Sequence, residues 1–227
     1  TLIISILGLL GLPLAGMIAI LLSEVRGKKF KKTVQTAITI PNFISWIIIY
    51  SIMFSLFSND GLLTTLVRGL SGNRDSTVTL LTNPGTAKLF MVLTNIWKTV
   101  GYNSIIFFAA VTGIDSQLYD AAAVDGAGRW QKILHITIPG ILPTFITLLI
   151  ISVGAILNNG FEQYYVFVNP MIQKNIEVLD YYVYRIGMLN NDIPASTAVS
   201  MIKTFISVVL VFSVNKLSKK TLGQSIL

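Results

Sequence analysis

Long apolar stretches alternate with short polar segments along the whole chain. Five apolar stretches lie near positions 2–22, 35–57, 86–114, 139–157 and 198–215. Each is close to the ~20 residues that a helix needs to cross a hydrocarbon core about 30 Å thick. Their apolar residues continue around the helix instead of forming one stripe, which favours spanning helices over helices that lie on a membrane surface. The pattern therefore predicts an all-α membrane protein with five transmembrane helices, in a single domain over 1–227.

The composition agrees with this pattern and excludes several kinds of functional site. Of the 227 residues, 53% are hydrophobic and 12% are charged, whereas about a quarter of the residues are charged in a soluble domain. Cysteine is absent, so the chain has no disulfide, thiolate metal site or catalytic thiol. His135 is the single histidine, which rules out a metal site built from several histidines. We therefore expect no catalytic residue and no metal site.

The positive charges predict the orientation of the helices. The net charge is +7, but most basic residues fall in segments that five alternating spans place on one side of the membrane. These segments contain ten Lys and Arg residues: Arg26, Lys28, Lys29, Lys31, Lys32, Arg129, Lys132, Lys216, Lys219 and Lys220. The opposite segments contain four: Arg68, Arg74, Lys174 and Arg185. Because basic loops stay in the cytoplasm, the ten mark the cytoplasmic side and do not indicate a nucleic-acid partner.

This orientation places Thr1 outside the cytoplasm. The chain opens inside an apolar run and shows no secretory cleavage pattern. A protein that begins in the cytoplasm would need one more helix upstream, so we expect a further span before Thr1. Two external segments, 58–84 and 158–194, separate the spans, and Asn59-Asp60-Gly61 and Ser71-Gly72-Asn73 are turn signals in the first.

A polar, helix-forming segment, 116–138, separates the third and fourth spans. Its first half is rich in alanine, which favours a helix, and Gly126 then interrupts the pattern. A helical pattern resumes at Arg129, and Pro139 suits the first turn of the next span. We expect two short helices joined by a sharp bend, a rigid knob whose glycine permits a turn that a side chain would obstruct. An alternative is a helix that lies in the lipid interface and is anchored by Trp130.

The spacing within 116–138 resembles the EAA signature of ABC importer permeases, EAA-x-x-DGA-x-x-x-x-x-F-x-x-I-x-LP. The chain has DAA at 120–122, DGA at 125–127, and isoleucines at the later apolar positions, followed by a proline. Asp120 replaces Glu, Ile133 replaces Phe and Ile138 replaces Leu. The resemblance implies that this segment docks into an ATPase subunit, through Asp120, Ala121, Ala122, Asp125, Gly126, Ala127, Arg129, Ile133, Ile136 and Pro139.

The resemblance also implies a fold, a location and a set of partners. The fold would be that of a type I ABC importer permease, with a six-helix core and a cytoplasmic coupling helix, in the bacterial cell membrane. The chain has no G-x-x-x-x-G-K-[ST] sequence, so it does not bind ATP by a P-loop. The resemblance implies that this chain holds no cofactor and that partner ATPases bind ATP and Mg²⁺. Expected partners are a second homologous permease, two ATPase subunits or an ATPase homodimer, an extracytoplasmic sugar-binding protein and membrane lipid.

Polar residues within the third span are candidates for a translocation path. Asn95 and Lys98 are three residues apart and share a helical face, and Tyr102 offers a ring on which a sugar could stack. An ionisable residue in a membrane is costly and usually faces a cavity or a partner. Alternatively, Lys98 extends to the membrane surface or Asn95 bonds to a neighbouring helix. Lys203, near the end of the last span, is expected to extend to the surface.

A second group of path candidates follows the fourth span and combines amides, a carboxylate and aromatic rings, which is typical chemistry for carbohydrate recognition. Its members are Asn158, Asn159, Glu162, Gln163 and Tyr164. With 179–185, this stretch resembles segments of maltose-type sugar permeases, especially those that import complex oligosaccharides, although Asn169-Pro170-Met171 stands where many have Gly-Gly-Pro. An alternative is a helix end with aromatic residues in the membrane interface.

We therefore expect a permease subunit of an ATP-driven, binding-protein-dependent importer of oligosaccharides. One alternative is a type I importer for a non-sugar solute, such as an amino acid, a peptide or an anion. Another is an ion-coupled secondary carrier or channel, which would need no ATPase and would usually carry carboxylates in the middle of its spans.

The predicted topology can be tested by cysteine labelling, because the native chain has no cysteine. Lys29→Cys should react with a membrane-impermeant maleimide only from the cytoplasm. Ser71→Cys should react only from the outside, because the second span lies between the two positions. Labelling of both positions from the same side would contradict the five-span arrangement.

Overall fold

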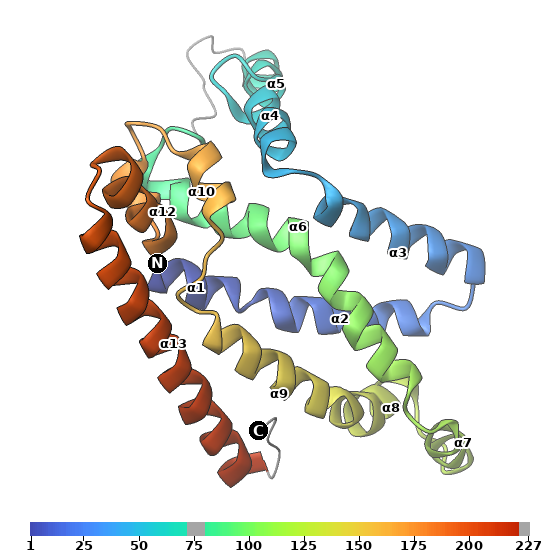
Figure 1. Cartoon of the computed structure of the whole chain (residues 1–227). Coiled ribbons are helices and arrows are strands. Elements are labelled where there is room, and N and C mark those ends of the chain that lie inside the picture. The colour runs from blue at the N-terminus through green and yellow to red at the C-terminus, as the bar shows by residue number, and fades with distance from the viewer. Residues whose placement is uncertain (72–79, 223–227) are drawn as a thin grey trace. The chain divides into compact units, whose positions relative to one another are not determined.

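The computed structural model describes residues 1–71 and 80–222 (Figure 1). The expected turn at Ser71-Gly72-Asn73 and the external Arg74 extend beyond the described residues. Within them the chain is helical and has no strand, so the all-α prediction is confirmed. The helices are α1 (Leu2–Gly8), α2 (Gly11–Glu24), α3 (Lys28–Phe43), α4 (Trp46–Phe57), α5 (Leu62–Ser71), α6 (Pro84–Thr112), α7 (Ser116–Val124), α8 (Arg129–Lys132), η1 (Ile133–Thr137, a π-helical turn), α9 (Ile138–Gly154), α10 (Phe161–Phe167), α11 (Gln173–Ile176), α12 (Leu179–Tyr184), η2 (Arg185–Leu189, π-helical) and α13 (Ile193–Leu222).

Four stretches of the described chain are long and apolar enough to cross a membrane. They are Leu2–Glu24, Trp46–Leu70, Arg129–Gly154 and Ile193–Lys220. Helix α6 has 29 residues, which is also enough to span a bilayer, but Asn95, Lys98 and Asn103 interrupt its apolar run. The number of spans therefore stays a prediction.

The second expected span, 35–57, is divided between two helices. Helix α3 contains Pro41 and ends at Phe43, and α4 begins at Trp46 after an extended Ser45. A proline inside a helix removes one backbone hydrogen bond and clashes with the preceding turn. The Ser45 hydroxyl accepts a hydrogen bond from the Ile48 backbone N–H at 3.4 Å, so α4 begins with an ordinary serine N-cap.

The chain divides into two compact units, and α6 and α13 each contribute residues to both. The first unit comprises Thr1–Gly8, Phe43–Asn95 and Ile156–Phe205, and the second comprises Leu9–Asn42, Ile96–Ala155 and Ile206–Leu227. In the first unit, aromatic rings connect α4, α6 and α10. Tyr50 meets Phe167 edge to face with ring centroids 5.1 Å apart, and Phe90 lies 6.1 Å from Phe167 and 5.4 Å from Phe57.

The core of the second unit is formed by α2, α6 and α9. Small residues on α2 allow the other helices to approach its backbone closely, as is common in membrane proteins. The buried members of this core are Leu12, Ala15, Ala19, Phe107, Val111 and Ile141.

Helices α3 and α6 also approach each other closely within the second unit. A Cβ atom added at Gly101 of α6 would lie 1.8 Å from the carbonyl oxygen of Ile38 on α3. No side chain fits at that distance, so the crossing of the two helices requires a glycine at this position.

Replacing Gly101 should therefore destabilise the second unit. We expect Gly101→Ala to lower the free energy of unfolding by about 1–3 kcal/mol, the usual cost of overpacking a core. Gly69 of α5 is a matched control, because a Cβ there meets nothing within 4 Å. Gly69→Ala should be neutral or stabilising by up to about 1 kcal/mol. Thermal unfolding of the purified protein in detergent measures both, and equal effects of the two substitutions would contradict this account of the crossing.

Candidate functional site

The EAA-like segment, 116–138, folds as a helix, a bend and a second helix, as its sequence predicts. The Asp115 carboxylate accepts a hydrogen bond from the Gln117 N–H at 2.9 Å and caps α7. After the bend, the Gln131 side chain accepts one from the Gly128 N–H at 2.7 Å at the start of α8. Each helix therefore begins with a local cap that its own sequence supplies.

The bend depends on the backbone conformation of Gly126. Its φ angle is +75°, in the left-handed region that glycine adopts without penalty. A Cβ atom at this position would meet nothing within 4 Å. The expected obstruction by a side chain is therefore conformational, and it does not arise from a clash with neighbouring atoms.

Large apolar side chains of the EAA-like segment are exposed. The exposed fraction is 53% for Leu118, 90% for Val124, 75% for Trp130 and 56% for Leu134. Several large apolar side chains exposed on one short segment can meet a partner protein or lipid. This surface fits docking to a partner protein, and it also fits the alternative in which Trp130 lies in the membrane interface.

Contacts within the second unit hold the two halves of the EAA-like segment together. The Tyr119 hydroxyl on α7 and the Thr137 hydroxyl of η1 share a hydrogen bond of 2.9 Å. Arg129 of α8 pairs with Glu24 at the end of α2 at 3.8 Å. Single π-helical turns often mark functional positions, and here η1 connects α8 directly to α9. The segment is thus connected to the beginning of α9 through η1 and to the end of α2 through Arg129.

Lys98, a predicted path residue, binds backbone carbonyl groups. Its side chain is buried, and Nζ donates hydrogen bonds to the oxygens of Pro41 at 3.2 Å and Asn42 at 3.0 Å. These carbonyls belong to the last turn of α3, where the helix leaves acceptors without partners and the helix dipole favours a cation. The Lys98 ammonium therefore caps the C-terminal end of α3.

Lys203 also has a partner inside the protein. Its Nζ pairs with the carboxylate of Asp180 on α12, and both side chains are largely buried. The expectation that Lys203 extends to the membrane surface was therefore wrong. The other oxygen of the Asp180 carboxylate accepts a hydrogen bond from the Asn159 N–H at 2.8 Å, so this pair also fixes the loop after α9.

Asn95 and Gln163 form a buried polar connection between α6 and α10 in the first unit. The Asn95 amide donates to the Gln163 side chain at 3.2 Å, and Gln163 donates to the Met91 carbonyl at 2.8 Å. This geometry agrees with the alternative in which Asn95 bonds to a neighbouring helix. Tyr164 is buried next to Gln163, and burial, with a smaller effect of the nearby Asp180 carboxylate, raises the pKa of its hydroxyl.

Three of the predicted path residues have exposed side chains: Tyr102 of α6, Asn158 and Glu162. Glu162 lies one helical turn from Tyr165 on α10, and Tyr165 is 49% exposed. Tyr165 belongs to the same polar and aromatic stretch after the fourth span, and its spacing of three from Glu162 places both on one helical face. These two residues present a carboxylate and an aromatic ring together, which suits a sugar.

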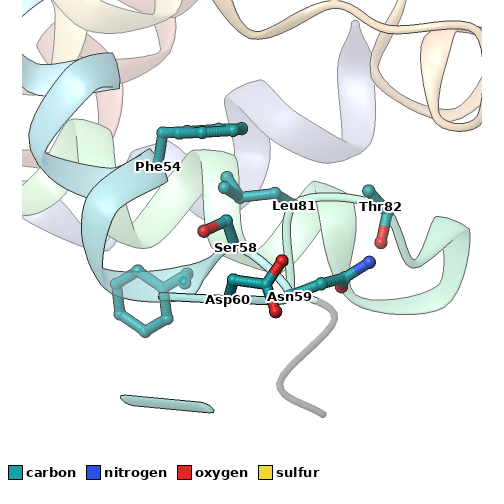
Figure 2. Close-up of a pocket in the computed structure, with 7 residues that line it drawn as sticks. Phe54, Ser58, Asn59, Asp60, Leu81 and Thr82 are labelled. Atoms are coloured by element: carbon teal, nitrogen blue, oxygen red, sulfur yellow. The ribbon is translucent and has the colours of Figure 1, made fainter. Parts of the chain in front are cut away.

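A cavity of about 260 Å³ that the sequence did not predict lies at the end of α4, and Figure 2 shows the side chains that line it. None of the predicted path residues lines it. Asp60 in its wall pairs with Arg68 of α5 at 3.5 Å, so part of its polar lining is engaged within the protein. Its lining residues are Phe54, Phe57, Ser58, Asn59, Asp60, Leu81 and Thr82.

The sequence and the fold are similar to those of components of transport systems. Residues 11–222 match the family described as binding-protein-dependent transport system inner membrane component. Protein LplB of Bacillus subtilis (strain 168) is 37% identical over 222 residues, which are 97% of this chain and 69% of that protein. The polygalacturonan/rhamnogalacturonan transport system permease protein YteP of the same organism is 39% identical over 209 residues, which are 92% of this chain and 64% of that protein.

A solved structure of a bacterial alginate ABC transporter, in complex with alginate pentasaccharide-bound periplasmic protein, contains a chain with the same fold. The TM-score is 0.93 and the identity 32%, and the match covers 99% of this chain and 78% of that chain. The present chain thus spans about two thirds of the two Bacillus subtilis relatives and somewhat more of the solved chain.

Lys98 should affect stability as well as transport. Lys98→Leu leaves the Pro41 and Asn42 carbonyls without this donor, and an unsatisfied buried acceptor costs about 1–3 kcal/mol. We expect a lower unfolding temperature of the purified protein in detergent, together with altered transport. Lys98→Arg, which keeps the charge and the donors, should lose less. An unfolding temperature of the Leu variant equal to that of the wild type would contradict the capping role.

Proposed function

The chain belongs to the family of inner membrane components of binding-protein-dependent transport systems, and on this basis we propose that it is the permease subunit of an ATP-driven oligosaccharide importer. Proteins of this family are transport components of the bacterial inner membrane and not enzymes. The observation that carries the proposal is the exposed helix–bend–helix of the EAA-like segment, because it gives a membrane protein without an ATP site a surface for an ATPase partner.

The EAA-like segment has the properties that mechanical coupling requires. Its apolar side chains Leu118, Val124, Trp130 and Leu134 are exposed and would be buried in a groove of the ATPase. Its halves are joined by the Tyr119–Thr137 hydrogen bond, and η1 continues into α9 without a loop. A displacement of the segment would therefore be passed to α9. The partner ATPases would bind ATP and Mg²⁺.

The proposed substrate is an oligosaccharide, recognised through hydroxyl groups and ring faces. The relative named for polygalacturonan and rhamnogalacturonan transport, and the structure of the alginate transporter, support this class. The exposed Glu162 and Tyr165 on α10 provide a hydrogen-bond acceptor and a stacking ring.

The proposed assembly contains this chain, a second homologous permease, two ATPase subunits or an ATPase homodimer, and an extracytoplasmic binding protein. The solved alginate transporter with its periplasmic protein supports the last of these. Closure of the ATPase dimer would move the EAA-like segments, and the permeases would alternate between inward-facing and outward-facing states.

Uptake measurements test the substrate class. The complete transporter would be reconstituted with its binding protein, and uptake of labelled oligosaccharides would be compared with uptake of an amino acid, a peptide and an anion. ATP-dependent uptake of an oligosaccharide supports the proposal. Preferred uptake of one of the other solutes would favour the non-sugar alternative, and uptake driven by an ion gradient without ATP would contradict both.

The bend at Gly126 gives a sharper test of coupling. Gly126→Val should disfavour the positive φ by about 1–3 kcal/mol, which corresponds to a roughly 5- to 150-fold shift away from the bend. We expect the variant to insert normally and to lose most of the stimulation of ATPase activity by loaded binding protein in proteoliposomes. Gly126→Asn should retain more stimulation, because asparagine tolerates this conformation.

Gly128→Ala is the matched control two residues away. Gly128 has a φ of −70°, and its Cβ would make only an ordinary contact with Gln131 at 3.6 Å. We expect wild-type stimulation in this variant. If Gly126→Val is stimulated as strongly as Gly128→Ala, the bend is not needed for coupling.

A further inference from the structure

Five of the seven residues from Arg26 to Lys32, between the end of α2 and the second turn of α3, are basic. No acidic residue follows in the sequence until Asp60. The nearest acidic residue upstream, Glu24, pairs with Arg129 of α8. The basic members of this cluster are Arg26, Lys28, Lys29, Lys31 and Lys32.

Four members of the cluster carry uncompensated charge. Arg26, Lys28, Lys29 and Lys32 are exposed, and none of them forms an ion pair with the described part of the chain. Like charges at such short spacing repel one another, and an anion from outside the chain would offset this repulsion.

Lys31 differs from the other four because it fixes the segment to the second unit. Its Nζ lies 5.2 Å from the centre of the Phe108 ring on α6 and donates to the Ser23 carbonyl at 3.5 Å. Phe30, between the two lysine pairs, is 64% exposed. The cluster therefore combines positive charges with an exposed aromatic ring, and Lys31 holds this segment against α2 and α6 of the second unit.

We propose that the segment Arg26–Lys32 binds the headgroup of an anionic phospholipid. It directly follows Leu2–Glu24, a stretch long and apolar enough to span the membrane, and basic clusters in this position attract anionic lipid headgroups. The Phe30 ring suits the boundary between headgroups and acyl chains, where aromatic side chains of membrane proteins gather. A bound lipid would stabilise the joint between α2 and α3, close to the contact of Glu24 with the EAA-like segment.

The basic residues near the C-terminal end of the chain lack this combination of charges and an aromatic ring. Lys216, Lys219 and Lys220 lie near the end of α13, and the last turn holds two of them, where lysines interact favourably with the dipole of their own helix. The residues between them are Leu217 and Ser218, so no aromatic ring accompanies these charges. We therefore assign the headgroup site to the first cluster alone.

A fluorescence titration tests the site without relying on transport. An environment-sensitive dye is attached to Thr36→Cys, one turn beyond Lys32, in the purified transporter in detergent. Short-chain phosphatidylglycerol should change the fluorescence with saturation, whereas phosphatidylcholine and inorganic phosphate at the same concentrations should not. In Lys28→Gln/Lys29→Gln/Lys32→Gln the affinity for phosphatidylglycerol should fall at least about tenfold. The matching triple arginine variant should bind like the wild type.

Three results would overturn the proposal. An equal response to phosphatidylglycerol and phosphatidylcholine would show that charge plays no part. An equal response to inorganic phosphate would indicate a site for free anions and not for lipid. Unchanged affinity in the glutamine variant would place binding elsewhere. If that variant does not assemble, the affinity of the wild type for phosphatidylglycerol is measured at two salt concentrations instead. Raising the salt from about 0.05 to 0.5 M must lower the affinity of an electrostatic site several-fold, and an unchanged affinity would also overturn the proposal.

Discussion

Backbone hydrogen bonding in a membrane is the constraint on which this structure depends. Lipid offers no partner to a free N–H or carbonyl group, so a helix that breaks or ends there needs donors from the protein. Lys98 supplies them to the end of α3, and the Ser5 hydroxyl donates to the Ile156 carbonyl just after α9. Polar side chains thus allow the helices to be interrupted.

The buried polar contacts of the first unit contrast with the exposed EAA-like segment. In the first unit, Gln163 and the Asp180–Lys203 pair are buried and engaged. The EAA-like segment instead exposes apolar side chains and depends on its own caps and on one glycine conformation. A surface that must dock can leave its apolar groups exposed only if local geometry, and not packing, maintains its shape.

The sequence was sufficient for features that depend on neighbouring residues. The all-α class follows from continuous apolar runs, and the bend at Gly126 follows from a glycine after an alanine-rich helix. The break between α3 and α4 was missed, because Pro41 also fits a continuous span. The roles of Lys98 and Gln163 could not be read either, since their partners lie 57 and 72 residues away. Residue type shows that a buried lysine needs a partner, but only the fold shows which one.

The hydrogen bonds that polar side chains form within the protein also indicate which residues are free to contact the solute. A side chain that already donates to a buried carbonyl must give up that bond before it can bind a sugar, and the carbonyl would then be left unsatisfied at a cost of about 1–3 kcal/mol. Lys98 and Gln163 are therefore not expected to contact the substrate directly, in contrast to what the sequence predicts for both. Their side chains are engaged with backbone carbonyls. Glu162 and Tyr165 are exposed and leave no buried carbonyl unsatisfied when they bind a solute, although the Tyr165 ring also packs on Phe161 and Tyr184. In the proposed transporter, selectivity is better sought at such residues, and changes at the buried ones should act on the packing of the helices that they connect.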